Sequence, residues 1–399
     1  MRRGLTAIVA LLVLVPLAHA SALPLPTRLA NALAVRGVTQ SSSGAVAVDL
    51  DSGRVVFERN ADLPLAPASN EKLPVTFSAL QELGPTYRFR TEVESTGRLV
   101  GAVWHGNLVL KGFGDPTLTT PMLDLLARRV LALGIHAVDG RIIGDESWFD
   151  TDRTAPGWKS SFYVLECPPL SALSVDRGWY DGHYAARPAV AAAGIFRKLL
   201  RQHGVAAGPA GAGRAPDGAA VLAAVRSRSL AYILREMDRQ SDNFVAELVL
   251  KELGAEKGAG GTSAAGAAVV KRTLAAAGIP TAGVVIADGS GLSLSDRLTV
   301  RTIVTLLVKT WDDGQLRGEV WRMLPVAGEN GTLVRRMRTG AARGEVRAKT
   351  GTTDVASALS GYARDRYAFA VLQNGAPVDD AAARKAQDRF ATALASASE

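Results

Sequence analysis

Three short motifs carry the residue types that acyl transfer through a serine requires. The first, Ser69–Lys72, reads Ser-Asn-Glu-Lys and pairs a hydroxyl with an amine three positions later. The second, Ser241–Asn243, reads Ser-Asp-Asn, and the third, Lys349–Thr352, reads Lys-Thr-Gly-Thr. A serine activated by a neighbouring lysine can form a covalent acyl intermediate. The three motifs together therefore predict nucleophilic catalysis by a serine.

The first motif is expected to supply the nucleophile, Ser69, and its general base, Lys72. A spacing of three residues at the start of a helix places both side chains on one helical face. Lys72 can accept the hydroxyl proton only when its amine is neutral. Burial and the nearby charge of Lys349 would both lower the pKa of that amine. The partial positive charge of the helix N-terminus would favour the negative charge that develops during attack.

The second motif is expected to assist proton transfer and to hold the substrate. The Ser241 hydroxyl would bridge Lys72 to the leaving nitrogen, and the Asn243 amide would bind the substrate backbone. Ser241 also has a purely structural interpretation, because Ser-Asp-Asn before an apolar helix is an ordinary way to begin that helix. Ser69 could likewise act as a helix cap.

The third motif is expected to bind the substrate at a strand end. Lys349 and Thr350 would hold a terminal carboxylate, and Thr352 would contribute a further substrate contact. Gly351 would let the substrate backbone approach the strand closely. The backbone amides of Ser69 and Thr352 would form the oxyanion hole. A charged strand end followed by a turn is the structural alternative, and the joint occurrence of three motifs in order favours catalysis.

Secondary-structure patterns at the two ends of the chain predict one sheet. Apolar, β-favouring runs occur early and late in the sequence and can pair as an antiparallel five-stranded sheet covered by helices. A helix is expected from Ser69 to Leu83, stopped by Gly-Pro, and a last amphipathic helix near the C-terminus. The five strand candidates are 45–50, 55–57, 344–349, 356–363 and 367–374.

The stretch 89–220 has a different sequence pattern from the rest of the chain and is interpreted as an inserted, mainly β domain. It contains short strand-like runs with helices near 123–133 and 189–202, and it ends in an Ala/Gly/Pro-rich tract, 206–220, expected to be a loose connection. Residues 21–88 and 221–399 would then form one discontinuous catalytic domain. A helix is also expected at 244–253, ended by Gly254.

The N-terminus is interpreted as a secretory signal peptide over residues 1–20. Arginines 2 and 3 precede a short apolar run and an Ala-His-Ala site. The alternative is a membrane anchor, for which the run is short. Removal of residues 1–20 would lower the formal charge from +8 to +6. No later stretch is apolar enough to span a membrane. The predicted location is periplasmic or extracellular, in the cell-wall space.

Composition restricts the partners of the chain. No basic run is interleaved with aromatic residues, so nucleic acid is not expected to bind. Cys167 is the only cysteine, which excludes an internal disulfide, and it is expected to be buried as a small hydrophobe. The five histidines lack zinc-ligand spacing, so no metal site is predicted.

The motifs and their order resemble the class C low-molecular-mass penicillin-binding proteins, the D-alanyl-D-alanine carboxypeptidase/endopeptidase family. The resemblance covers nearly all of the mature chain. It implies an α+β fold with a penicillin-recognising serine transpeptidase-like domain. The stretch between the first two motifs is short for members with two nested insertions, so one inserted domain or a trimmed pair is expected. Further stretches that resemble the family are 112–118, 288–293, 324–328 and 331–333.

The resemblance also implies an activity. Ser69 would be acylated by the penultimate D-alanine of a peptidoglycan stem peptide that ends in D-Ala-D-Ala, release the terminal D-alanine and then be freed by water. β-Lactams would acylate the same serine, and no cofactor would be needed.

Three alternatives differ in their chemistry. A β-lactamase shares the motifs, but the Glu-x-x-x-Asn pattern of class A enzymes is absent. A Ser-His-Asp esterase would need a Gly-x-Ser-x-Gly elbow, which is also absent. A non-catalytic protein that binds wall peptides would have no need for a nucleophile and a base together.

Overall fold

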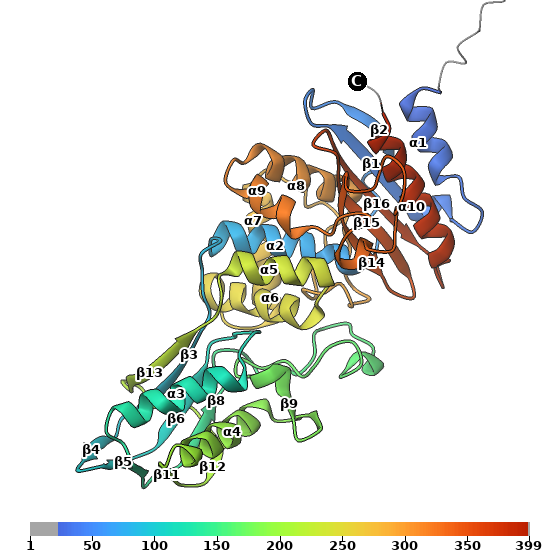
Figure 1. The fold of residues 1–399 in the computed structure, drawn as a ribbon. Coiled ribbons are helices and arrows are strands. Elements are labelled where there is room, and N and C mark those ends of the chain that lie inside the picture. The colour runs from blue at the N-terminus through green and yellow to red at the C-terminus, as the bar shows by residue number, and fades with distance from the viewer. Residues whose placement is uncertain (1–22, 398–399) are drawn as a thin grey trace, which may run out of the picture.

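A five-stranded antiparallel sheet brings the two ends of the chain together. The computed structural model describes residues 23–397, and Figure 1 shows the sheet beside the first and last helices. The strand order is β14-β15-β16-β1-β2, which confirms the predicted pairing. The strands are β1 (Ser43–Asp49), β2 (Val55–Arg59), β14 (Val346–Thr352), β15 (Ala356–Ala363) and β16 (Tyr367–Asn374).

Helices cover both faces of this sheet. Residues of β1 alternate between the two faces, because successive side chains of a strand point in opposite directions. Ala45 and Ala47 pack with α1 (Leu25–Leu33) and α10 (Asp380–Ala395), whereas Val46 and Val48 pack with α8 (Val300–Asp312). Every residue of β1 and β15 is buried, as expected for strands covered on both sides.

A bundle of helices lies beside the sheet with α2 (Lys72–Glu82) at its centre. All residues of α2 from Lys72 to Leu80 are buried. Four helices pack around it: α5 (Leu230–Gln240), α6 (Asn243–Lys257), α7 (Ser263–Ala276) and α8. A further helix, α9 (Leu316–Met323), packs on α5 and α8. The bundle therefore holds the first two motifs, and the sheet edge strand β14 holds the third.

Two predicted helix boundaries were wrong. The helix expected from Ser69 begins at Lys72, and a 3-10 turn, η2 (Ala68–Glu71), precedes it. Gly254 does not end α6, which continues to Lys257. A Cβ at Gly254 would lie 2.6 Å from the Gly260 carbonyl oxygen and 2.8 Å from the Gly266 nitrogen. This glycine therefore permits close packing of α6 against the start of α7.

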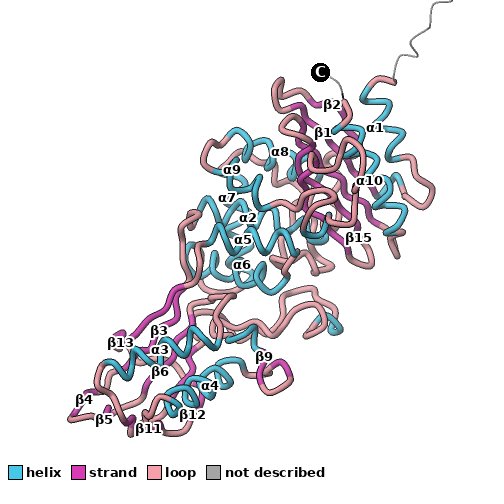
Figure 2. Tube along the Cα trace, viewed as in Figure 1, coloured by secondary structure: helices cyan, strands magenta, loops and turns pink. Residues whose placement is uncertain are grey.

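The chain between α2 and α5 forms a separate body with its own core (Figure 2). Its larger sheet has the order β12-β8-β6-β3-β13, and its smaller sheet has the order β11-β7-β5-β4. Two helices, α3 (Thr120–Ala132) and α4 (Pro188–Gln202), pack on this core. The first six strands are β3 (Arg90–Ser95), β4 (Arg98–Val100), β5 (Val103–His105), β6 (Leu108–Gly112), β7 (Ala137–Val138) and β8 (Ile142–Asp145).

The tract 206–220 is not the loose connection that its composition predicted. Strands β11 (Ala206–Ala207) and β12 (Ala210–Ala212) pair in parallel with β7 and β8. Small residues are required here, because a Cβ at Gly208 would lie 2.1 Å from the Gly140 carbonyl oxygen. Strand β13 (Ala220–Arg226) then pairs with β3. We therefore propose that the inserted domain extends to about residue 226 rather than 220.

Two further sequence predictions concern the N-terminus and the cysteine. The predicted signal peptide lies outside the described residues. Within residues 23–397 no helix is long and apolar enough to cross a membrane. Cys167 is completely buried, and burial raises the pKa of its thiol. It is therefore confirmed as a small buried residue.

Replacing Phe390 with alanine should destabilise the domain built on the five-stranded sheet. Phe390 is completely buried on α10 and packs edge-on against Phe57 of β2, with the ring centroids 5.5 Å apart. We expect a loss of about 3–5 kcal/mol in the free energy of unfolding, because the cavity cannot be refilled. Urea unfolding followed by circular dichroism measures it. The exposed neighbour Arg389→Ala should change stability by about 0.5 kcal/mol or less, and equal losses would contradict the packing role.

Candidate active site

The seven predicted site residues meet at one place between the bundle and the sheet. A cavity of about 480 Å³ is lined by Ser69, Ser241, Asn243, Thr350 and Thr352. The two lysines, Lys72 and Lys349, are completely buried beneath it. Residues from three distant parts of the sequence therefore share one small volume.

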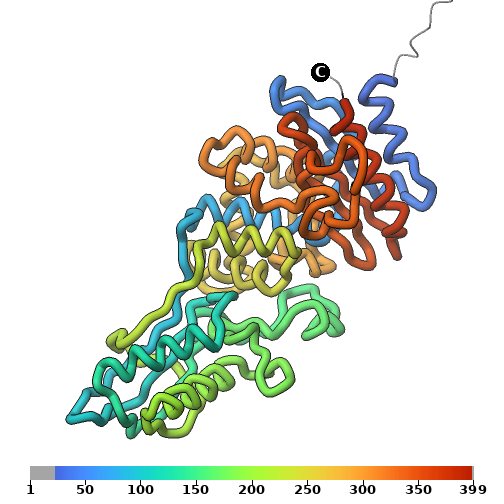
Figure 3. The backbone as a smooth tube through the Cα atoms, viewed as in Figure 1, coloured from blue at the N-terminus to red at the C-terminus, as the bar shows by residue number. Residues whose placement is uncertain are grey.

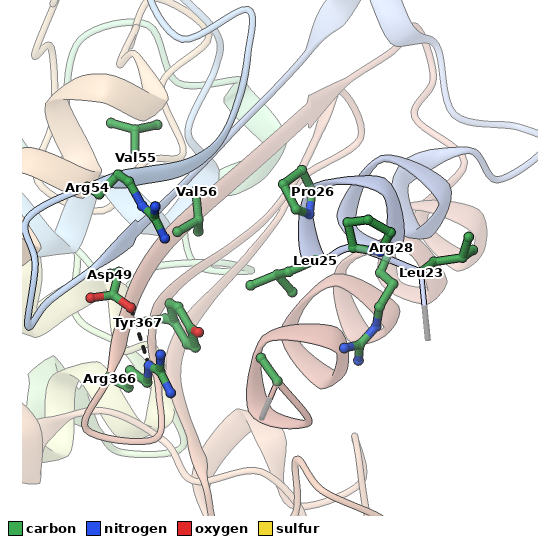
Figure 4. Close-up of a pocket in the computed structure, with 12 residues that line it drawn as sticks. Leu23, Leu25, Pro26, Arg28, Asp49, Arg54, Val55, Val56, Arg366 and Tyr367 are labelled. Atoms are coloured by element: carbon green, nitrogen blue, oxygen red, sulfur yellow. Dashed lines mark hydrogen bonds and ion pairs between the residues drawn. The ribbon is translucent and has the colours of Figure 1, made fainter. Parts of the chain in front are cut away.

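A second cavity, of about 620 Å³, lies elsewhere (Figure 4). It lies between α1, β2 and the start of β16, and Arg28, Arg54 and Arg366 line it. Asp49 accepts a hydrogen bond from Arg366 Nε at 3.3 Å. None of the motif residues lines this cavity, so the smaller cavity is the candidate active site.

The turn that carries Ser69 is fixed by close backbone contacts. Ala68 has a left-handed backbone with φ 47°. A Cβ at Gly351 would lie 3.0 Å from the Ser69 nitrogen, and a Cβ at Gly291 would lie 1.9 Å from the Ala68 carbonyl oxygen. Both glycines are therefore needed so that their backbones can approach the turn. Gly351 was predicted to let the substrate backbone approach; the structure shows that it lets the turn that carries Ser69 approach β14.

The Lys72 amine has three hydrogen-bond partners. Its Nζ lies 3.1 Å from Ser69 Oγ, 2.8 Å from Asn243 Oδ1 and 2.7 Å from the Ser290 carbonyl oxygen. The amide oxygen and the carbonyl can only accept hydrogen bonds. A neutral amine must therefore direct its two N–H groups toward them, which leaves its lone pair facing the Ser69 hydroxyl. This is the geometry of a general base.

Burial controls the charge of both lysines. Desolvation lowers the pKa of Lys72, and the charges of Asp288 and Glu247 oppose that shift. Desolvation, together with the charge of Lys72, lowers the pKa of Lys349 to about 7. Burial thus shifts both amines toward the neutral form.

Ser241 contacts a different lysine from the one predicted. Lys349 Nζ donates to Ser241 Oγ at 2.8 Å, whereas the Lys72 hydrogen bonds described above go to other groups. Ser241 is left-handed, with φ 59°, and ends α5. The cap of α6 is Asp242, whose side chain accepts from the Val245 nitrogen at 3.1 Å. The structural interpretation of Ser241 as that cap was therefore wrong.

Ser69 does not cap a helix either. No side-chain capping bond is present at η2 or at the start of α2. Instead its hydroxyl lines the cavity beside Lys72. The neighbouring Asn70 Nδ2 donates to the Lys349 carbonyl oxygen at 3.1 Å. This bond joins the first motif to β14.

Several neighbours of the site were given no role in the sequence analysis, although Thr332 lies in the stretch 331–333 noted there by resemblance. Thr350 Oγ1 donates to Thr332 Oγ1 at 2.8 Å, and Arg384 Nη2 lies 3.3 Å from Thr352 Oγ1. Arg335 and Arg336 also line the cavity. Two of these arginines are ion-paired, Arg384 with Asp380 and Arg336 with Asp388, so much of the positive charge at this rim is compensated within the protein. Arg384 lies on α10, and only the fold brings it near β14.

Five buried carboxyl groups surround the two lysines. They are Glu71, Asp238, Glu247, Asp288 and Asp296. Burial raises the pKa of Glu71, raises that of Glu247 to about 8 and raises that of Asp296 to about 12. In the described part of the chain, no group of three or more such side chains is arranged to hold a metal ion. The charges of Asp238, Glu247 and Asp288 act on the pKa of Lys72.

Two of these carboxyls aim the Ser290 carbonyl at Lys72. Glu247 Oε1 accepts from the backbone nitrogens of Gly289 and Ser290 at 3.0 and 2.8 Å. Asp288 accepts from the Gly291 nitrogen at 2.7 Å and from Ser290 Oγ at 3.0 Å. The stretch 288–293 was singled out in the sequence only by resemblance. Its geometry shows that it supplies a partner for the Lys72 amine.

Comparison with known proteins agrees with the motifs. The model of the D-Ala-D-Ala carboxypeptidase 3 (S13) family matches residues 25–186 and 182–397. A D-alanyl-D-alanine carboxypeptidase from Actinomadura sp. is 32% identical, over 84% of this chain and 78% of its own length. A carboxypeptidase from Mycobacterium tuberculosis is 31% identical, over 95% of this chain and 86% of its own length.

Solved structures show the same fold. The crystal structure of penicillin binding protein 4 from Haemophilus influenzae matches with a TM-score of 0.80 at 21% identity, covering 92% of this chain and 97% of that chain. Another structure of that protein, complexed with a β-lactam, matches with a TM-score of 0.76. The predicted fold class and the resemblance to class C penicillin-binding proteins are confirmed. The chain therefore belongs to the D-Ala-D-Ala carboxypeptidase 3 (S13) family of serine peptidases.

Proposed function

We propose that this protein removes the terminal D-alanine from peptidoglycan stem peptides through an acyl-enzyme on Ser69. The observation that carries the proposal is the Lys72 amine, which lies 3.1 Å from Ser69 Oγ while two fixed acceptors hold its N–H groups. The names of the Actinomadura and Mycobacterium relatives support the reaction class.

Acylation begins with attack of Ser69 Oγ on the carbonyl carbon of the penultimate D-alanine. Lys72 takes the hydroxyl proton as the new C–O bond forms. The C–N bond to the terminal D-alanine then breaks, and the leaving nitrogen receives a proton through Ser241. Lys349 donates to Ser241 at 2.8 Å and can replace the proton that Ser241 gives up, while Lys72 keeps the proton taken from Ser69 until the ester is hydrolysed. Water afterwards hydrolyses the ester and frees Ser69.

Substrate binding is assigned to the edge of β14. The backbone amides of Ser69 and Thr352 form the oxyanion hole, where charge develops in the transition state. Lys349 and Thr350 bind the terminal carboxylate, and Arg384 lies at the rim of the same cavity. The Asn243 amide also binds the substrate backbone. The substrate must compete there with Lys72 and the Glu166 carbonyl, which bond this amide in the structure.

β-Lactams are proposed to acylate the same serine. The β-lactam complex of the Haemophilus protein supports this, because that protein shares the fold. The predicted signal peptide fits the location of such substrates, and we propose that the protein is exported to the cell-wall space. The opposing alternatives, a β-lactamase and a non-catalytic binding protein, are distinguished by the following experiment.

Intact-mass spectrometry after incubation with benzylpenicillin should show a persistent adduct on the wild-type protein. Ser69→Ala should show none, because the nucleophilic oxygen is absent, while its thermal transition stays nearly unchanged. Labelling of Ser69→Ala would refute the nucleophile. Rapid loss of the wild-type adduct would favour a β-lactamase, and no reaction of the wild type would favour a binding protein.

Selectivity for a free substrate carboxylate should fall as pH rises through about 7. The pKa of Lys349 is lowered to about 7, so its charge is present below that pH and lost above it. The ratio of kcat/KM for carboxylate-ended and amide-ended peptides, measured from about pH 5.5 to about pH 8.5, should reveal this loss. Lys349→Ala should have a low, flat ratio. A ratio that does not change with pH in the wild type would remove the carboxylate role of Lys349.

Gly351→Ala should slow acylation without unfolding the protein. The added Cβ would lie 3.0 Å from the Pro67 carbonyl oxygen and the Ser69 nitrogen, so the turn that carries Ser69 must shift. We expect the acylation rate to fall about tenfold or more, since small displacements of a nucleophile are costly. Stopped-flow labelling with a fluorescent penicillin measures the rate. Gly194→Ala, which meets open space on α4, is the control, and equal rates for the two variants would contradict this constraint.

A further inference from the structure

The second motif is held from outside the catalytic domain. Ser241–Asn243 lies between α5 and α6, and two residues of the inserted domain contact it. The Glu166 carbonyl oxygen accepts from Asn243 Nδ2 at 3.1 Å, and the Arg177 guanidinium forms an ion pair with Asp242. Both contacts come from one segment, residues 158–178, which Figure 3 shows in green reaching from the inserted domain toward the catalytic domain.

The Glu166 carbonyl determines how the Asn243 amide is turned. A side-chain amide has a donating and an accepting end, and a carbonyl oxygen can only accept. Glu166 therefore requires the Nδ2 end of Asn243, which leaves the Oδ1 end to face Lys72 Nζ at 2.8 Å. A flipped amide would present N–H groups to the amine and could not accept from it. The inserted domain thus selects the orientation that the base needs.

Arg177 holds the backbone on either side of Asn243. Its guanidinium pairs with the Asp242 carboxylate and lies 5.4 Å from the centroid of the Phe244 ring. The other oxygen of Asp242 caps α6 through the Val245 nitrogen. One arginine therefore contacts both sequence neighbours of Asn243.

The conformation of Arg177 is strained and is enforced locally. Asp176 and Arg177 lie in the 3-10 turn η4 (Val175–Gly178) with φ values of 46° and 60°, a region that costs energy for residues other than glycine. The Asp176 nitrogen donates to the Leu118 carbonyl oxygen at 2.9 Å, and the Asp176 carboxylate accepts from Thr120 Oγ1 at 2.6 Å. Leu118 is the last residue of the stretch 112–118, which was noted in the sequence by resemblance. This stretch therefore supports the turn that carries Arg177.

The same segment is anchored at its other end. Trp158 Nε1 donates to Asp288 Oδ2 at 2.7 Å, and Lys159 pairs with Asp354. Asp288 belongs to the loop whose Ser290 carbonyl also contacts Lys72. Two of the three partners of the Lys72 amine are therefore supported by the inserted domain.

We propose that the inserted domain contributes to the active site by holding the second motif. Arg177 is a positioning residue that, through Asp242, orients Asn243 toward the Lys72 amine. The inference deepens the proposed function and rests on it, because it assumes that Lys72 is the base for Ser69. It assigns the segment 158–178 a role in catalysis in addition to any role in shaping the cavity.

A double-mutant cycle in the full-length protein tests this inference. Arg177→Met keeps the length of the side chain and removes its charge. Asp242→Ser removes the carboxylate and retains an oxygen that can cap α6. We expect Arg177→Met to lower both the acylation rate with benzylpenicillin and kcat about tenfold, with KM and the melting temperature little changed. Arg177→Lys should recover part of the rate. In the Asp242→Ser background, Arg177→Met should have almost no further effect.

A matched control is Arg128→Met, which removes an exposed arginine that pairs with Asp124 in the same domain. It should acylate at the wild-type rate. If Arg177→Met acylates as fast as Arg128→Met, or costs as much in the Asp242→Ser background as alone, the positioning role is refuted while acylation of Ser69 stands. If the wild type itself is not acylated, the proposed function fails first.

Discussion

Burial of the Lys72 amine is the constraint on which the active site depends. An amine removed from water must find hydrogen-bond partners, since a buried unpaired polar group costs several kcal/mol. Lys72 finds them in Ser69, Asn243 and Ser290. These partners come from η2, the start of α6 and the loop after α7. The helical bundle must therefore bring three separate segments to one point.

The buried carboxyls support one of these hydrogen-bond partners, the Ser290 carbonyl, from further inside the protein. Glu247 and Asp288 bind the backbone N–H groups of residues 289–291, so the Ser290 carbonyl is left to face Lys72. Their charges oppose the effect of burial on the pKa of Lys72. The neutral base that acylation needs thus reflects a balance between desolvation and nearby negative charge. Burial and the charge of Asp288 raise the pKa of Asp296 to about 12.

Much of the fold followed from the sequence because local patterns were strong. Apolar runs identified the five strands, and their antiparallel pairing is confirmed. Two of the errors share one cause. Gly254 suggested the end of a helix and the tract around Gly208 suggested a loose loop, yet each glycine permits two backbones to pack closely. A glycine that is needed for a long-range contact looks the same in sequence as one that ends an element.

By itself the sequence determined the family and the seven candidate residues, because acyl transfer needs particular groups at fixed local spacings. Only the tertiary structure decided how those groups are connected. It shows that Ser241 bonds with Lys349 rather than with Lys72. It also shows that Ser290 and Arg384 lie at the site and that Arg177 pairs with Asp242. These contacts link residues far apart in the chain, and no local pattern encodes which distant side chains will meet. Hydrogen-bond geometry inside a packed core settles that choice.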